Sequence, residues 1–212
     1  SSSEIAKEIR EHPELDTWSY NVSDTVLYTT EQNIEELKNI AKEIEILCLT
    51  GGEPLLIKQY HSFLDYLIES GLCKNIRVDI FTNCSVYNQK FMEKLEQFRE
   101  VNFIMSIDGI GKVAEYIRYG TDWNIVEKNI LQFANLKKPF NLLYNTAISQ
   151  YTLFDVSSLA KFLFSLYEIN NGLDSRCYSV VNPKPLHIDN MSNTHRKIAL
   201  EQIDKALDRK ST

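Results

Sequence analysis

LCLTGGEP, at residues 47–54, is an apolar run with strand character that stops abruptly at two glycines, a carboxylate and a proline. Gly51 and Gly52 lack Cβ atoms, so a ligand can lie directly against the backbone there, and Pro54 restricts the chain just after Glu53. The Glu53 carboxylate suits a small cationic group. The stretch therefore predicts a ligand site at the end of a strand.

Composition narrows the class of protein. Of the 212 residues, 43% are hydrophobic and 25% are charged, which predicts one soluble domain over residues 1–212 with a sizeable core. The net charge of -6 and the lack of a basic stripe argue against nucleic acid as a partner. No run approaches the roughly 18 apolar residues of a membrane span, and residues 1–8 do not resemble a signal peptide. We therefore expect a cytoplasmic protein that does not enter a membrane.

Apolar strand-like runs alternate with segments of helical periodicity along the chain. In one such helical segment the apolar residues Tyr60, Phe63, Leu64 and Leu67 recur at the spacing of a single helix face. The runs begin about 26 to 39 residues apart, which is the length of a βα unit. The predicted strands are Glu45–Thr50, Ile76–Thr82, Asn102–Ile107, Asn141–Ile148 and Arg176–Val181.

Strict β–α alternation implies a parallel sheet, either doubly wound or curled into a full or partial barrel. In both architectures the functional residues lie at the carboxyl ends of the strands. Schiff-base chemistry is disfavoured because the one lysine near such an end, Lys184, lies in a loop beyond Pro183. Histidine metal ligation is disfavoured because no histidine falls at a strand end, and the cysteines form no CxxC pair.

The strand ends also carry an ordered set of short motifs. They are TGGEP at 50–54, FTN at 81–83, SIDG at 106–109 with Arg118 downstream, YIRYGTDW at 116–123 and VNPKPL at 181–186. In this order the motifs resemble those of radical S-adenosylmethionine (radical SAM) enzymes, most closely the SPASM/twitch group. The resemblance spans nearly the whole chain and implies a partial (β/α)6 TIM-like barrel.

The resemblance implies a cofactor and a reaction. Gly51, Gly52 and Glu53 would receive the amino group of the S-adenosylmethionine methionine, the glycines through their carbonyls and Glu53 through its carboxylate. The cofactor would lie beside a [4Fe-4S] cluster reduced by an external electron donor. Its cleavage would yield a 5'-deoxyadenosyl radical that abstracts hydrogen from a peptide or small-molecule substrate. The protein would position the reactants and exclude water.

Further site residues follow from the same resemblance. Ser106 and Asp108 would contact the ribose hydroxyls or the methionine carboxylate, and Arg118 is the fork-shaped partner for that carboxylate. Asn83 and Asn145 would line the cavity, and Val181 and Asn182 would border the adenine.

The chain departs from the family in one respect, because it contains no CxxxCxxC cluster motif. The sequence starts with SSS followed by a short helical pattern at residues 4–10, and a serine-containing segment and a helix follow the last cluster cysteine in this family. We therefore expect residue 1 to lie just downstream of the cluster loop of a longer protein. The first barrel strand, the cluster ligands and a C-terminal auxiliary-cluster domain would then lie outside these residues.

Other interpretations of the same residues stay open. Gly51 and Gly52 suit a tight turn, and Ser106 with Asp108 suits an Asx-type turn. Arg118 could pair with a neighbouring acid, Glu115 or Asp122, and Tyr116, Tyr119 and Trp123 could pack in the core. Cys84 could be a packed thiol. The chain could also be a cluster-free binding or scaffold module, or an unrelated α/β-barrel enzyme using Glu53 and Asp108 as acid and base.

Overall fold

The structure is a computed structural model that describes residues 31–170, 174–180 and 184–207. In these ranges five strands form a single parallel sheet in the order β1-β2-β3-β4-β5. The strands are β1 (Ile46–Leu49), β2 (Arg77–Thr82), β3 (Glu100–Ser106), β4 (Phe140–Ile148) and β5 (Asp174–Ser179). The predicted α/β fold with parallel strands is confirmed, and a sheet with strands in sequential order fits a partial barrel.

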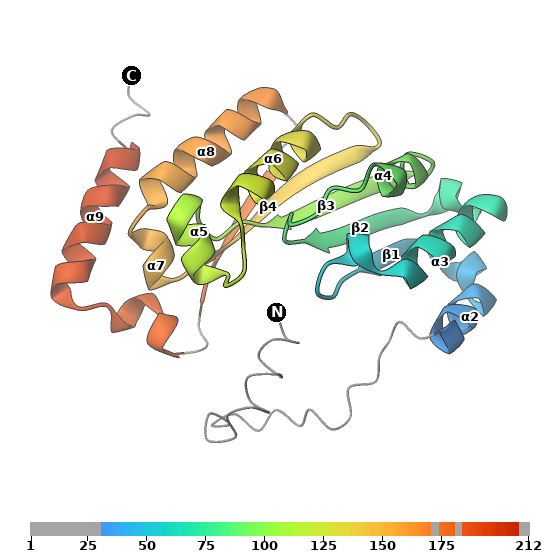
Figure 1. Cartoon of the computed structure of the whole chain (residues 1–212), viewed down its shortest axis with the longest axis horizontal. Coiled ribbons are helices and arrows are strands. Elements are labelled where there is room, and N and C mark those ends of the chain that lie inside the picture. The colour runs from blue at the N-terminus through green and yellow to red at the C-terminus, as the bar shows by residue number, and fades with distance from the viewer. Residues whose placement is uncertain (1–30, 171–173, 181–183, 208–212) are drawn as a thin grey trace.

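Helices connect the strands and cover one face of the sheet, along which α3, α4, α6 and α8 lie (Figure 1). The helices are α2 (Glu31–Asn39), α3 (Lys58–Glu69), α4 (Gln89–Leu95), α5 (Gly111–Ile117), α6 (Trp123–Ala134), α7 (Gln150–Leu153), α8 (Val156–Ile169) and α9 (Asn193–Leu207). Gly71 follows α3 with a φ of 74°, as expected of a glycine that ends a helix. Within the described residues, none of the helices combines the length and apolarity that a membrane crossing requires.

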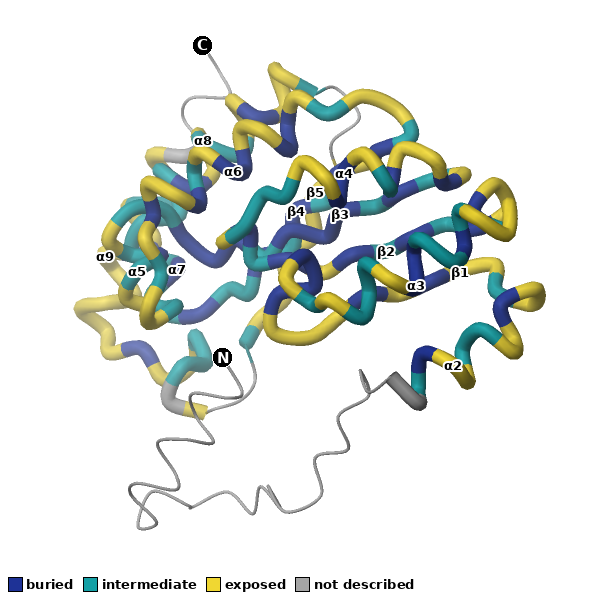
Figure 2. The backbone as a smooth tube through the Cα atoms, turned by 45° about the vertical axis from the view of Figure 1, so that its right-hand side comes forward, coloured by how far each residue is buried: buried dark blue, intermediate teal, exposed yellow. Residues whose placement is uncertain are grey.

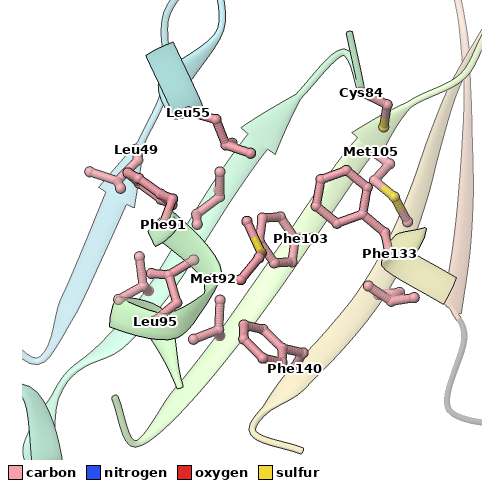
Figure 3. Close-up of a cluster of buried hydrophobic side chains, with 14 of the residues drawn as sticks. Leu49, Leu55, Cys84, Phe91, Met92, Leu95, Phe103, Met105, Phe133 and Phe140 are labelled. Atoms are coloured by element: carbon pink, nitrogen blue, oxygen red, sulfur yellow. The ribbon is translucent and has the colours of Figure 1, made fainter. Parts of the chain in front are cut away.

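The core lies between the sheet and these helices. Side chains alternate across a strand, so every second residue of each strand points toward the helices, and these positions are buried in β1 to β4. Figure 2 shows the buried positions concentrated in the central strands. Phe103 lies at the middle of this layer, with its ring centroid 4.8 Å from that of Phe133 and 5.9 Å from that of Phe140 (Figure 3).

The opposite side of the sheet, which we call the open face, carries the alternate residues of the strands. Toward the amino ends of the strands its side chains form a polar row. Arg77 donates to both carboxylate oxygens of Asp79, at 3.0 and 3.1 Å, and Asn102 donates to Asp79 at 2.7 Å. Asn141 donates to Asn102 at 2.9 Å. The polar groups of this row therefore satisfy one another across three strands.

The boundaries of the elements differ from the sequence prediction by one or two residues. The third strand begins at Glu100 rather than Asn102, and the fifth begins at Asp174 rather than Arg176. These extra residues are mostly polar and exposed or half-buried, so their strand conformation comes from pairing with the neighbouring strand and not from propensity. The predicted end of the fifth strand, Val181, lies outside the described residues.

The aromatic layer should dominate the stability of the sheet. Replacing the fully buried Phe103 with alanine removes two ring contacts and leaves a cavity, so Phe103→Ala should lower the free energy of unfolding by about 3–5 kcal/mol. Phe164→Ala is the matched control, because Phe164 is 64% exposed on α8 and its loss should cost well under about 1 kcal/mol. Urea unfolding of both variants measures the difference, and equal costs would contradict this account.

Candidate functional site

The carboxyl ends of the parallel strands meet at one edge of the sheet, and the predicted site residues gather there. The loop after β1 holds Gly51, Gly52 and Glu53, Asn83 follows β2, Ser106 and Asp108 lie at the end of β3, Asn145 lies within β4, and Arg118 follows α5. Gly51 has a φ of 132°, a backbone conformation that side chains with a Cβ rarely adopt, so this turn requires glycine. The loop is anchored further by Tyr60, whose hydroxyl donates to the Thr50 carbonyl at 2.9 Å.

Glu53 joins the loop after β1 to the end of β2. Only 8% of the residue is exposed, and the Thr82 hydroxyl lies 3.0 and 2.9 Å from its two carboxylate oxygens. The Asn83 backbone N–H donates to the same carboxylate at 3.1 Å, and the Leu55 N–H donates from the other side at 3.4 Å. Burial raises the pKa of the Glu53 carboxyl, although the hydrogen bonds from Thr82, Asn83 and Leu55 oppose the shift. Glu53 is therefore a buried carboxylate held between two strand ends.

A second chain of hydrogen bonds fixes the segment that carries Asn83. The Cys84 N–H donates to the Thr82 hydroxyl oxygen at 3.0 Å, and the Cys84 carbonyl accepts from the Asn129 side chain at 2.9 Å. Cys84 has a φ of 60°, which is uncommon for a residue other than glycine. Burial raises the pKa of the Cys84 thiol above its ordinary value, which fits a packed, unreactive thiol. The path Glu53–Thr82–Cys84–Asn129 thus connects the strand-end loops to helix α6.

Asp108 and Arg118 form the other polar element of the site. The Arg118 Nε and Nη2 atoms lie 2.9 and 2.6 Å from Asp108 Oδ2, and Asp108 Oδ1 accepts from the Ala147 N–H at 2.8 Å. Arg118 therefore pairs with Asp108, and not with the neighbouring acids considered from the sequence. The carboxylate of Asp108 ties β4 to the end of α5 rather than closing a local Asx turn.

A small cavity lies beside the Asp108–Arg118 pair and reaches Asn83 at the end of β2. Its volume is about 20 Å³, and it is lined by Asn83, Ser106, Asp108 and Arg118 on its polar side and by Ile117 and Trp123 among its apolar residues. Four predicted site residues therefore line one cavity between the ends of β2 and β3 and the helices that follow. Trp123 is buried as core packing predicts, whereas Tyr119 is 90% exposed and does not pack in the core.

The remaining predicted residues fall in two groups. Asn145 lies within β4 on the open face, where it pairs in register with Ser106. Val181 and Asn182 lie outside the described residues, so their expected place near an adenine stays a prediction. Sequence reasoning missed Thr82 and Asn129 as site residues. Asn129 gave one usable signal, because it is a polar residue on the buried face of the amphipathic helix α6.

The described residues supply no set of iron ligands. Within the ranges that the structure describes, no three histidine, cysteine, aspartate or glutamate side chains are grouped so that they could hold a metal ion. The four cysteines, Cys48, Cys73, Cys84 and Cys177, are free thiols. The described residues therefore do not fit an iron–sulfur cluster.

Comparison with known proteins identifies the family. The profile of the radical SAM superfamily matches residues 9–160. The chain belongs to the radical SAM superfamily. Its sequence is 25% identical over 193 residues to the uncharacterized protein MJ0907 of Methanocaldococcus jannaschii. That match covers 89% of this chain and 63% of the relative, so the chain spans less than two thirds of the length of the protein it matches.

Solved structures also resemble this chain, and one of them does so at low sequence identity. It is the structure of TYW1 with a lysine-pyruvate adduct bound, with a TM-score of 0.47 and 13% sequence identity over 82% of this chain and 59% of the other. The family assignment itself agrees with the resemblance seen in the motifs at the strand ends. The assignment to the SPASM/twitch group stays a prediction.

The Thr82 hydroxyl should be essential to the strand-end loops. Thr82→Val keeps the shape of the side chain but leaves the Glu53 carboxylate and the Cys84 N–H without this partner. The free energy of unfolding should therefore fall by about 1–3 kcal/mol. Thr82→Ser keeps the hydroxyl and is the control. Thermal and urea unfolding compare the two, and a valine variant as stable as the serine variant would contradict the role given to this hydroxyl.

The raised pKa of Glu53 should give the protein a characteristic pH dependence. The folded state holds this proton more tightly than the unfolded chain, so the contribution of Glu53 to stability falls as the pH rises above its ordinary pKa of 4.5. The unfolding free energy of the wild type minus that of Glu53→Gln should therefore decrease between about pH 4 and pH 7. Urea unfolding of both proteins at several pH values measures this difference in unfolding free energy. A difference that stays constant or grows with pH would refute the prediction.

Proposed function

We propose that this chain forms the S-adenosylmethionine-binding core of a radical SAM enzyme. The proposal rests on one observation, which is that the Gly51–Glu53 turn after β1, tied to the end of β2, and the Asp108–Arg118 pair after β3 lie at the same edge of the sheet in a radical SAM superfamily member. One group offers acceptors for an ammonium and the other offers donors for a carboxylate. The two charged groups of a methionine moiety match that arrangement.

The glycine turn would receive the amino group of the cofactor. Both oxygens of Glu53 already accept hydrogen bonds from Thr82 or from backbone N–H groups, so most of the capacity of this carboxylate is used within the protein. The Gly52 carbonyl receives a long hydrogen bond of 3.4 Å from Asn83 and keeps capacity for a further donor. Glu53 would then act mainly by holding the turn and adding negative charge, while the glycine carbonyls accept the ammonium.

Arg118 would receive the carboxylate group of the cofactor. Asp108 engages Nε and Nη2 of the guanidinium, and the guanidinium has five N–H donors, so donors remain for a ligand. Asp108 orients the guanidinium, and Ser106 offers a hydroxyl to a ribose or a carboxylate from the same cavity. Asn83 and Asn145 would line the cofactor site, and Val181 and Asn182 would border the adenine.

The chemistry would come from the cofactor and a cluster held elsewhere in the protein. When bound, S-adenosylmethionine would supply the capacity to abstract a hydrogen atom from the substrate. The [4Fe-4S] cluster would be held by residues other than those that the structure describes. The residues of this chain would bind and orient the cofactor and exclude water from it.

Binding of S-adenosylmethionine tests the proposal. Arg118→Gln should weaken binding by roughly tenfold to hundredfold, because a charge-assisted hydrogen bond to the carboxylate is lost. Arg99→Gln is the control, since Arg99 is an exposed arginine at the opposite end of the sheet. Isothermal titration of both variants measures the effect. Failure of the wild-type chain to bind, or an equal loss in the control, would overturn the assignment.

Glu53→Gln separates this proposal from acid–base catalysis by an unrelated barrel. Loss of the negative charge beside the cofactor ammonium predicts weaker binding, whereas a pure acid–base role predicts that binding is kept and only turnover is lost. The engagement of Asp108 by Arg118 and the Ala147 N–H favours a binding role for that carboxylate as well.

Iron content tests the radical reaction itself and separates it from a cluster-free scaffold module. The protein expressed with the coding sequence upstream of residue 1 should, after anaerobic reconstitution, hold about four irons and four sulfides per chain. A protein that binds no iron would exclude the radical mechanism and leave a binding or scaffold function.

A further inference from the structure

Arg176 is a positive charge on the open face that has no acidic partner among the described residues. It lies in β5, whose six residues are all exposed. Arg77 on the open face forms an ion pair with Asp79, and Arg118 in the site forms one with Asp108. Arg176, by contrast, forms no ion pair and no side-chain hydrogen bond with any residue of the described ranges.

The register of the sheet places this guanidinium beside the predicted cofactor residues. Arg176 pairs with Asn145 across β4 and β5, and Asn145 pairs with Ser106 across β3 and β4. All three side chains therefore project from the open face at one level. Tyr178 lies on the same face one step closer to the carboxyl ends, opposite the small side chain of Ala147, and is 54% exposed. A guanidinium, an amide and a phenol therefore lie on the same face of β4 and β5, beside the small residues Ser106 and Ala147.

An apolar row lies directly below this level. Phe81 pairs with Ile104, and Ile104 pairs with Leu143, so the three side chains form a continuous stripe across β2, β3 and β4 on the open face. Phe81 is 40% exposed although it is a large aromatic residue. On the other side of this stripe, toward the amino ends of the strands, lies the polar row of the open face, whose side chains hydrogen-bond to one another. Among the described residues, the free donors therefore lie on one side of the apolar stripe.

We propose that Arg176 binds an anionic group of the substrate, a carboxylate or a phosphate, while an apolar part of the same molecule packs against the exposed Phe81 and the half-buried Leu143, on either side of the buried Ile104. A guanidinium favours these anions because its planar fork of donors matches their oxygens. The acid closest along the strand, Asp174, pairs in register with Leu143 and uses Oδ1 to accept from the Ser175 N–H. The substrate of this site is thus a small amphiphilic anion.

This inference rests on the proposed function for one point only. If Arg118 holds the carboxylate of the cofactor, then Arg176, on a different strand, is available to the second reactant. The position also suits a hydrogen abstraction, because the level of Ser106 and Asn145 would be shared by cofactor and substrate. The anion site itself can be tested without the cofactor.

Three matched probes test the anion site on the full chain: hexanoate, hexyl phosphate and 1-hexanol. They share a hydrocarbon tail and differ in the head group. Binding is followed by titration calorimetry and by the Nε–H resonances of the arginine side chains in NMR spectra. At least one anionic probe should bind about tenfold more tightly than 1-hexanol, because a charge-assisted hydrogen bond adds to the burial of the tail. The tighter anion identifies the head group as carboxylate or phosphate.

Variants assign the effect to Arg176. Arg176→Gln should weaken anion binding about tenfold, to the level of 1-hexanol, and Arg176→Lys should keep part of the preference because it retains the charge but not the fork. Lys161→Gln removes the same charge from an exposed position on α8 and should change nothing. Phe81→Ala should weaken the binding of all three probes by a similar factor, because it removes only an apolar contact with their shared tail.

Each outcome decides between the two proposals. Anion binding that survives in Arg176→Gln, or a wild-type chain that does not prefer anions to 1-hexanol, overturns the substrate site. Titration of S-adenosylmethionine into the same samples reports on the cofactor site independently. Loss of that binding with anion binding intact would overturn the proposed function and leave the anion site standing.

Discussion

The buried carboxylate of Glu53 is the interaction on which the arrangement of the site depends. It lies where the loop after β1 meets the end of β2, and its four hydrogen bonds come from both segments. Burying a carboxylate is costly unless it is hydrogen-bonded, so these donors must stay in place for the loop to keep its shape. The position of Gly51 and Gly52 is therefore set by residues of the neighbouring strand.

The same constraint extends into the helical layer. Thr82 both donates to Glu53 and accepts from the Cys84 N–H, and the Cys84 carbonyl is held by Asn129 of α6. A chain of hydrogen bonds in a buried setting is stronger when every member is satisfied, and weaker as a whole when one is removed. The loop geometry at the strand ends is in this way coupled to the packing of α6 against the sheet.

The two faces of the sheet carry different kinds of side chains. The face toward the helices is closed by aliphatic and aromatic side chains around Phe103 and supplies most of the apolar burial. The open face is graded along the strands, from a polar row that satisfies itself, through an apolar stripe, to free donors near the carboxyl ends. Such a gradient would orient the proposed amphiphilic anion in one direction. Specificity on this face would come from the order of the rows rather than from any single residue.

The sequence by itself determined the fold class, the succession of strands along the chain and the set of strand-end motifs, because hydrophobic periodicity and glycine placement are local properties of the chain. It placed Asn83, Ser106, Asp108 and Arg118 at one edge, and the structure brings these four residues to one cavity. Only the tertiary structure decided which partner each charge takes. Arg118 pairs with Asp108 ten residues away, and Glu53 pairs with Thr82 across strands, because contacts between strands depend on register and burial that local patterns do not encode. The position of the Arg176 guanidinium was decided in the same way, since only the register of β5 against β4 sets it on the open face.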